Sequence, residues 1–197
     1  MPNAKREITP DDLMPLDEYG AIRREHRRKL IQTKASRRLH VGPFATFHFE
    51  NYDTMWAQVQ EMLYIEKGGE DQVADELSAY NPLIPQGREL VATMLIEIED
   101  EGRRRRTLAT LGHIEEKIVL SVGNERITGV PEDDIDRTTD AGKTSAVHFI
   151  TFPFTDAQAT LFKSGDVQAT LGIEHENYRH IAVLQEDVRT ELAGDLD

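Results

Sequence analysis

The chain has 197 residues, of which 39% are hydrophobic and 30% are charged, and it carries a net charge of −13. This balance is typical of a globular protein, and no window approaches the roughly 18 uninterrupted apolar residues that a membrane span needs. The complete lack of cysteine excludes a cysteine nucleophile, a thiolate zinc site, a disulfide and a cysteine-ligated iron–sulfur cluster. Because the first residues also lack a secretory signal pattern, we expect a cytoplasmic protein with no membrane partner.

The charge is distributed unevenly along the chain. Residues 1–40 hold ten Lys or Arg and six Asp or Glu, a net +4, which leaves −17 for the remainder. We therefore divide the chain into a basic helical arm over 1–41 and an α+β body over 42–197, read together as a single domain. The simplest interpretation is that the arm packs on the acidic body. Anion or nucleic-acid binding through 23–38 is the sharper alternative, although the overall negative charge makes nucleic acid an unlikely partner.

The first half of the chain predicts mostly helices. Thr9 and Pro10 are typical of a helix start, Pro15 ends that short helix, and a longer helix follows over 16–38. A strand is predicted over 44–50. After a turn at 51–53, a helix is predicted to about 66, and it ends at Lys67-Gly68-Gly69. A further short helix over about 70–80 leads into a proline-rich loop at 81–85.

Two later segments share the order strand, helix, strand, strand. The first covers 89–130 and the second covers 145–184, so the pattern indicates a possible internal repeat. The polar segment 131–145 between them is predicted to be a mobile surface loop, and 185–197 to be a final helix. Adjacent strands with no room for a crossover helix favour antiparallel pairing. The predicted fold class is therefore α+β, with the helical arm packed on a mainly antiparallel sheet.

The stretch 42–69 contains the first candidate site. Alternation over 44–50 places His48 and Glu50 on the face opposite to Phe47 and Phe49. In the following helix, Glu61 points away from the apolar arc, whereas Glu66 falls near its middle. A buried Glu66 would need a partner, a metal or a proton, but if the helix ends at Lys67 this side chain lies in water.

The second candidate site is the segment 174–180. If Glu176 and Asn177 form a two-residue hairpin turn, His175 pairs with Tyr178, and His180 falls on the same face as both. This inference depends on register, because one extra residue in the turn would send His180 to the other face.

Together these residues suggest a nitrogen and oxygen ligand set for iron, manganese or zinc. The tentative metal ligands are His48, Glu50, Glu66, His175 and His180, and Tyr178 and Glu61 are further site candidates. No strong metal signature accompanies them, so structural histidines are the competing interpretation. The sequence also has no Walker loop, no G-x-G-x-x-G and no G-x-S-x-G, so nucleotide-dependent and serine-hydrolase functions have no support.

Several stretches together resemble a known bacterial family. They are ITPDDLMPLDEY, VGPFATFHFENYDTMWAQVQEML, ELSAYNPLIPQG and GIEHENYRH, and they resemble the domain of unknown function 3501 family over nearly the whole chain. That family has no established activity. Its genes tend to lie beside those of a rubrerythrin-like diiron protein and an iron–sulfur oxidoreductase, so the resemblance implies a role near peroxide or iron redox chemistry.

These observations leave three hypotheses for function. The favoured one is a non-enzymatic accessory or binding protein that works with a redox partner in oxidative-stress or iron metabolism. The alternative is a metal-dependent enzyme or metal-binding protein with the His/Glu site described above. Anion or nucleic-acid binding through the basic arm is the third hypothesis.

Overall fold

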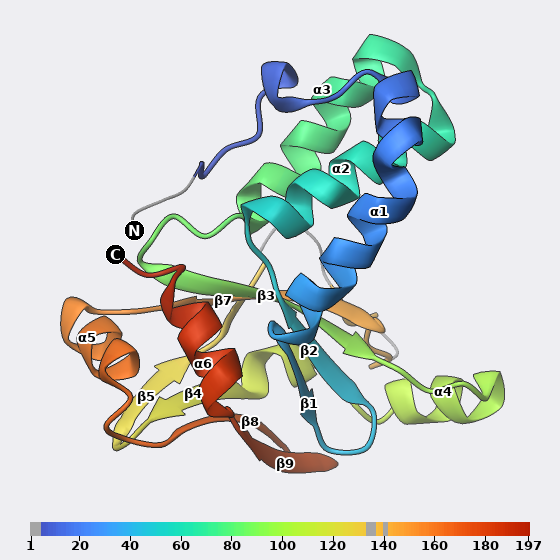
Figure 1. The fold of residues 1–197 in the computed structure, drawn as a ribbon. Coiled ribbons are helices and arrows are strands. Elements are labelled where there is room, and N and C mark those ends of the chain that lie inside the picture. The colour runs from blue at the N-terminus through green and yellow to red at the C-terminus, as the bar shows by residue number, and fades with distance from the viewer. Residues whose placement is uncertain (1–4, 133–136, 140–141) are drawn as a thin grey trace.

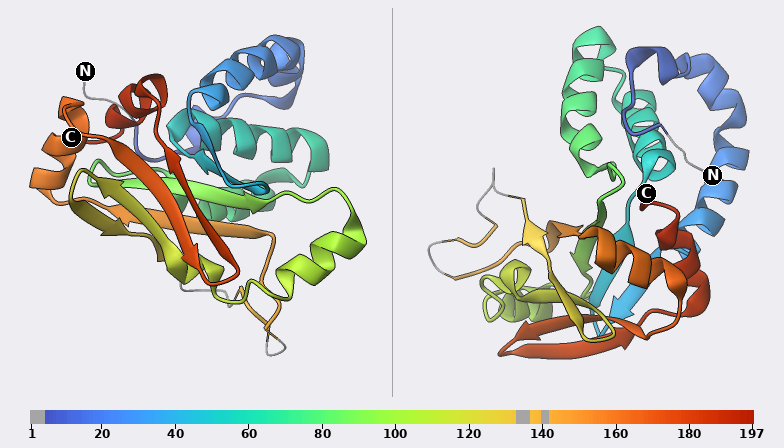
Figure 2. Two further views of the ribbon diagram at one scale, coloured as in Figure 1. Left: turned by 90° about the horizontal axis from the view of Figure 1, so that it is seen from below. Right: turned by 90° about the vertical axis from the view of Figure 1, so that its left-hand side faces the viewer.

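Two antiparallel sheets and one layer of helices are stacked on one another in the computed structural model of the protein (Figure 1). The structure describes residues 5–132, 137–139 and 142–197. Sheet A has the strand order β1-β2-β3-β7-β6 and lies in the middle, and sheet B has the order β5-β4-β8-β9. Two further views show the helical layer on one side of sheet A and sheet B on the other (Figure 2). The predicted α+β class with antiparallel pairing is confirmed.

The N-terminal part of the chain forms the helical layer. Its elements are η1 (Pro10–Asp12), α1 (Leu16–Ala35), α2 (Tyr52–Glu66), α3 (Gly69–Tyr80) and η2 (Asn81–Leu83). Pro15 lies immediately before α1, as expected, and its ring suits a position that donates no intrahelical hydrogen bond. In the part of the chain that the structure describes, no helix has the length and apolarity needed to cross a membrane.

The strands of the two sheets come from both halves of the chain. Sheet A contains β1 (Arg38–Val41), β2 (Ala45–Phe49), β3 (Glu89–Ile96), β6 (Val130–Pro131) and β7 (Val147–Pro153). Sheet B contains β4 (Ile118–Val122), β5 (Glu125–Thr128), β8 (Ala169–His175) and β9 (Tyr178–Val183). The remaining elements are α4 (Glu101–Leu108), η3 (Ile114–Lys117), α5 (Asp156–Ser164) and α6 (Glu186–Ala193). β1, from the predicted arm, pairs with β2 of the body.

The main core lies between the two sheets. Sheet A contributes Phe47, Phe49 and Met94 to it, and sheet B contributes Leu120 and Leu171, all of them fully buried or nearly so. A second, smaller cluster lies on the opposite face of sheet A, where Val91 and Phe149 meet the helices; its helical members include Met55, Val59 and Leu63. Because side chains alternate along β3 and β7, these two strands supply both clusters.

The two predicted repeat segments occupy equivalent places in the fold. β3 and β7 are neighbours in sheet A, while β4 and β8 are neighbours in sheet B with β5 and β9 at its edges. Each segment thus sends its first strand to one sheet and its last two strands to the other. The predicted mobile loop 131–145 falls partly on 133–136 and 140–141, which lie outside the described residues.

Candidate functional site

A pocket of about 320 Å³ opens between the helix-facing side of sheet A and the helices above it. One wall comes from β2, β3 and β7, and the other comes from α2, α3 and η2, with the end of α1 at the side. Five of the lining residues are apolar, namely Met55, Leu83, Leu95, Val147 and Phe149. The polar lining residues are Lys34, His48, Glu50, Gln58, Tyr80 and Thr93. A pocket that combines apolar walls with convergent polar groups is a common form of small-molecule site.

Glu50 is the buried acid of this pocket. It follows β2 directly, and its backbone amide donates to the carbonyl of Val91 at 2.8 Å, so the pairing of β2 with β3 continues to this residue. The residue is only 6% exposed. Each carboxylate oxygen accepts a hydrogen bond from a hydroxyl group, one from Thr54 at 2.6 Å and one from Thr93 at 2.7 Å. A carboxylate has about four acceptor positions, so Glu50 can accept further donors from a ligand.

The position of Glu50 depends on how α2 begins. Asn51 caps the helix through a 3.0 Å bond from the amide of Thr54, and the Thr54 hydroxyl accepts from the amide of Asn51 at 3.0 Å. The same hydroxyl donates to Glu50. A strand that runs straight into a capped helix therefore fixes the carboxylate at the junction of the two elements.

His48 lies two residues before Glu50 on the same face of β2 and is half-buried. Across the sheet it faces Thr93 on one side and Arg38 on the other. Burial lowers the pKa of the imidazole, the charge of Glu50 raises it, and the charge of Lys34 lowers it. A neutral imidazole at neutral pH offers one donor and one acceptor to a ligand. His48 and Glu50 thus lie together in the pocket, as the alternation predicted.

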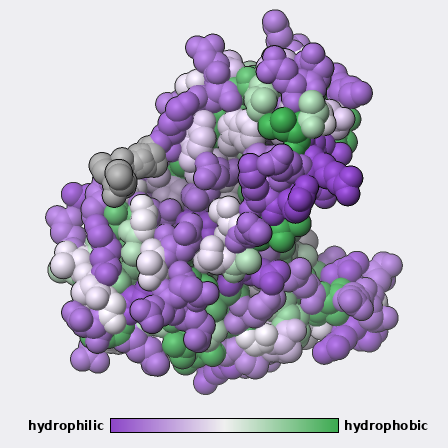
Figure 3. Space-filling view, viewed as in Figure 1, coloured by the Kyte–Doolittle hydropathy of each residue, from purple (hydrophilic) through white to green (hydrophobic). Residues whose placement is uncertain are grey.

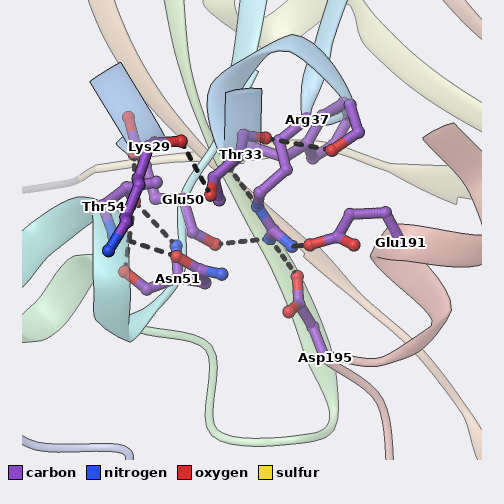
Figure 4. Close-up of polar contacts among 10 residues, drawn as sticks. Lys29, Thr33, Arg37, Glu50, Asn51, Thr54, Glu191 and Asp195 are labelled. Carbon is purple, nitrogen blue, oxygen red and sulfur yellow. Dashed lines mark hydrogen bonds and ion pairs between the residues drawn. The ribbon is translucent and has the colours of Figure 1, made fainter. Parts of the chain in front are cut away.

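A buried arginine holds this end of β2 in place (Figure 4). Arg37 is 1% exposed, and its guanidinium donates to the backbone carbonyls of Phe49 at 3.0 Å and Glu50 at 3.1 Å. It also pairs with Asp195 and, at 3.2 Å, with Glu191. Burial raises the pKa of the Asp195 carboxyl, and the charge of Arg37 opposes that rise. In the sequence, Arg37 is only one of the basic residues of the arm, because nothing local to 36–38 indicates its partners near the C-terminus.

The hairpin of sheet B has the predicted register. His175 pairs with Tyr178 and Ile173 pairs with His180 across a two-residue turn. Both ring nitrogens of His175 are engaged by backbone groups, with the carbonyl of Gly112 at 3.1 Å and the amide of Asn177 at 3.2 Å. His175 therefore serves the turn and the neighbouring loop through its hydrogen bonds.

Tyr178 ties this hairpin to the turn between β1 and β2. Its hydroxyl donates to the carbonyl of Val41 at 2.7 Å and accepts from the amides of Phe44 and Ala45 at 3.2 and 3.1 Å. The ring of His180 packs edge-on against Tyr178, with centroids 4.5 Å apart. Tyr178 and His180 together are called the clamp, because they join the hairpin of sheet B to the β1–β2 turn of sheet A.

The structure does not gather the predicted metal ligands into one set. His48 and Glu50 face the helices, whereas His175 lies on sheet B against the opposite side of sheet A. Within the described ranges, no group of three or more His, Cys, Asp or Glu residues is placed to hold a metal ion.

The two remaining candidates lie on α2 away from the pocket. Glu66 is exposed at the end of α2, where Lys67 adopts a left-handed conformation with φ of 56°, and it accepts a hydrogen bond from Gln72 at 2.9 Å. Of the two outcomes considered for Glu66, the solvent-facing one is correct. Glu61 joins α2 to α1, because it accepts from the Tyr19 hydroxyl at 2.7 Å and from two nitrogens of Arg23.

Comparison with known proteins decides the family. The model of the family described as "Protein of unknown function (DUF3501)" matches residues 7–196. This chain belongs to that family. A crystal structure of a "novel protein of unknown function" from Burkholderia pseudomallei is also similar to this DUF3501 protein, with 39% identity and a TM-score of 0.90. That match covers 96% of this chain and 99% of the other. A search of curated proteins finds no match.

Proposed function

We propose that this DUF3501 protein is a binding protein whose ligand is a small organic molecule held in the pocket beside His48 and Glu50. The observation that carries the proposal is the buried Glu50 carboxylate, which two threonine hydroxyls orient at the wall of a pocket that also has five apolar lining residues. A buried carboxylate is costly unless it is paired, and its unused acceptor positions favour a ligand that brings N–H or O–H donors. The apolar wall favours a hydrocarbon or aromatic body.

The polar groups around the pocket define the ligand further. Glu50 suits an amine, amidine or hydroxyl group, and the neutral His48 can donate or accept beside it. Lys34 adds one positive charge to the lining, which suits an acidic group on the same ligand. The pocket therefore fits a small amphipathic molecule with a donor group at one end and an apolar body.

A screen of small amines and hydroxyl compounds by ligand-observed NMR, followed by thermal shift, tests the proposal. Hits should raise the melting temperature in proportion to the logarithm of ligand concentration. The Glu50→Gln variant keeps the side-chain shape but loses the charge, and we expect it to weaken binding by about tenfold or more. The matched control is Glu66→Gln on the exposed end of α2. Equal binding by both variants, or no hits at all, would refute the proposal.

We further propose a cellular location and a class of partner for this protein. We propose that the protein acts in the cytoplasm as an accessory to a rubrerythrin-like protein or an iron–sulfur oxidoreductase, and the family resemblance supports this choice. Co-purification of the endogenous protein under gentle conditions tests it. Absence of both partners from the purified material would argue against the redox setting and would leave the pocket proposal unaffected.

Metal binding is a second candidate function, because His48 and Glu50 face one pocket and are both metal-ligating residue types. Iron, manganese and zinc are the metals that such a nitrogen and oxygen pair accepts. Metal analysis of protein purified without a histidine tag separates this candidate from the first. A content below about a tenth of an equivalent, with melting unchanged by added metal, would eliminate it.

A further inference from the structure

A second hollow, of about 600 Å³, lies on the far side of the helical layer, along α1. Arg23, Arg24, Arg27 and Arg28 line it together with Tyr64 of α2. These arginines follow one another at i, i+1, i+4 and i+5, so they form two adjacent rows on one face of the helix. Figure 3 shows the surface over α1 as one of the most hydrophilic parts of that side of the molecule.

The shape of this hollow follows from how α1 meets α2. Gly20 lets the two helices approach, because a Cβ there would lie 3.1 Å from the ring of Tyr64. The guanidinium of Arg23 lies over the same ring, 5.0 Å from its centroid, and pairs with Glu61. Arg23 and Tyr64 therefore form a fixed floor, and the other arginines stand around it.

Three of the four arginines have no acidic partner of their own. Within the described residues, Arg24, Arg27 and Arg28 form no ion pair, and all three are exposed. None of the described Asp or Glu residues lies within ion-pair distance of these three guanidinium groups, although Arg27 interacts electrostatically with Glu61 and Arg28 with Glu25. A cluster of like charges repels itself, so an acidic partner that binds here would remove that repulsion.

An exposed apolar residue completes the surface. Ile31 lines the same hollow one turn beyond Arg27 and is 69% exposed. Arginine, tyrosine and an aliphatic anchor together are typical of protein–protein contact sites. A long nucleic acid would also meet the acidic remainder of the molecule. Arg23 lies over one face of the Tyr64 ring and Tyr19 packs edge-on against it, so these two contacts compete with the stacking of a base.

We infer that the α1 hollow is a docking site for an acidic helical segment of a partner protein. Carboxylates spaced four residues apart on such a segment would match the four-residue spacing of Arg24 and Arg28, and one apolar side chain would rest on Ile31. The contact is separate from the His48 pocket, on which the proposed function depends. It supplies the protein with a second surface through which an accessory role can operate.

The probe for this inference is a fluorescein-labelled peptide of about 16 residues that has Glu at i and i+4 and Leu at i+3. We expect it to bind at physiological salt with a Kd of about 100 μM or tighter. The same peptide with Lys in place of every Glu should not bind. Failure of the acidic peptide to bind at about 1 mM would overturn the inference.

Two variants test where the probe binds. Reversing Arg24, Arg27 and Arg28 to Glu should weaken binding by at least about tenfold, while Ile31→Ser should weaken it by about threefold. The matched control reverses three arginines of α4, namely Arg103, Arg105 and Arg106, and makes the same change in net charge. Equal loss in both triple variants would mean general charge attraction and would refute a docking site. Circular dichroism melting shows that each variant is folded.

Nucleic acid is the competing ligand in the same assay. A labelled single strand and a labelled duplex should bind more weakly than the acidic peptide at every salt concentration. Tighter binding of either one, lost in the α1 variant and retained in the α4 variant, would replace the docking proposal with a nucleic-acid site.

Discussion

The guanidinium of Arg37 holds the backbone carbonyl of Glu50 at 3.1 Å, and the carboxylate of Glu50 extends away from it to Thr54 and Thr93. One residue thus links two environments. Its main chain belongs to a buried ion-pair network with the C-terminal segment, and its side chain belongs to the pocket. Because Arg37 also binds the carbonyl of Phe49, the end of β2 cannot shift without breaking this network.

Replacing Arg37 is expected to destabilise the fold strongly. Arg37→Met would leave the mostly buried Asp195 carboxylate without its positive partner, and the carbonyls of Phe49 and Glu50 would lose this donor. Breaking a buried pair in this way costs about 3–5 kcal/mol of unfolding free energy. Urea unfolding measures the loss, and Arg38→Met, at an exposed neighbouring position, is the control. A loss below about 1 kcal/mol would contradict the role assigned to Arg37.

His48 should make the protein less stable as the pH falls. Its pKa in the folded protein is lowered by burial, so the unfolded chain takes up the proton first, near its ordinary pKa of about 6.5. The contribution of His48 to the free energy of unfolding is therefore fully present above about pH 6.5. It declines as the pH falls from there toward the pKa of the folded protein. His48→Gln should show a smaller decline between about pH 7 and 5, by at most about 1.4 kcal/mol per pH unit. Part of the decline will remain, because burial also lowers the pKa of His148.

The neighbours of His48 should move its pKa in opposite directions. The charge of Glu50 raises this pKa and the charge of Lys34 lowers it. Glu50→Gln should therefore lower the pKa of His48, and Lys34→Gln should raise it. NMR titration of the imidazole ring reads both changes directly. A shift of the same sign in both variants would show that the two side chains do not face His48 as described.

The sequence predicted the features that depend on local periodicity. The division of β2 into two faces and the register of the β8–β9 hairpin follow from a two-residue repeat and a two-residue turn, and the structure agrees with both. It could not predict that sheet A would separate His48 from His175, since strand order and layer order depend on long-range packing. The burial of Arg37 was equally hidden, because its partner Asp195 lies 158 residues away in sequence.

Tyr178 should contribute through its hydroxyl more than through its ring. Tyr178→Phe keeps the packing but leaves the amides of Phe44 and Ala45 and the carbonyl of Val41 without that partner. Unsatisfied buried groups of this kind cost about 1–3 kcal/mol. The control is Tyr80→Phe, whose hydroxyl is partly exposed and makes a long 3.4 Å contact with Gln58. Equal unfolding free energies for the two variants would show that the clamp carries no stability.

Gly42 is the position where the β1–β2 turn meets this clamp. Its φ is +73°, and an added Cβ would lie 2.5 Å from Cγ of His180 and 2.6 Å from the Tyr178 hydroxyl oxygen. Gly42→Ala should therefore lower the free energy of unfolding for two reasons. Alanine is disfavoured in the left-handed region by about 1–2 kcal/mol, and the clash of its methyl group adds a cost of similar size. Gly69→Ala is the matched control, because its φ is +78° and no atom lies within 4 Å of its Cβ position. Gly69→Ala should show only the cost of the left-handed backbone.

The double variant of Gly42→Ala and His180→Ala tests the clash directly. It should recover part of the stability that the clash removes, since it lacks the ring that the methyl group meets. Urea unfolding of the double-mutant cycle measures that coupling, and additive losses would mean that the turn relaxes away from His180.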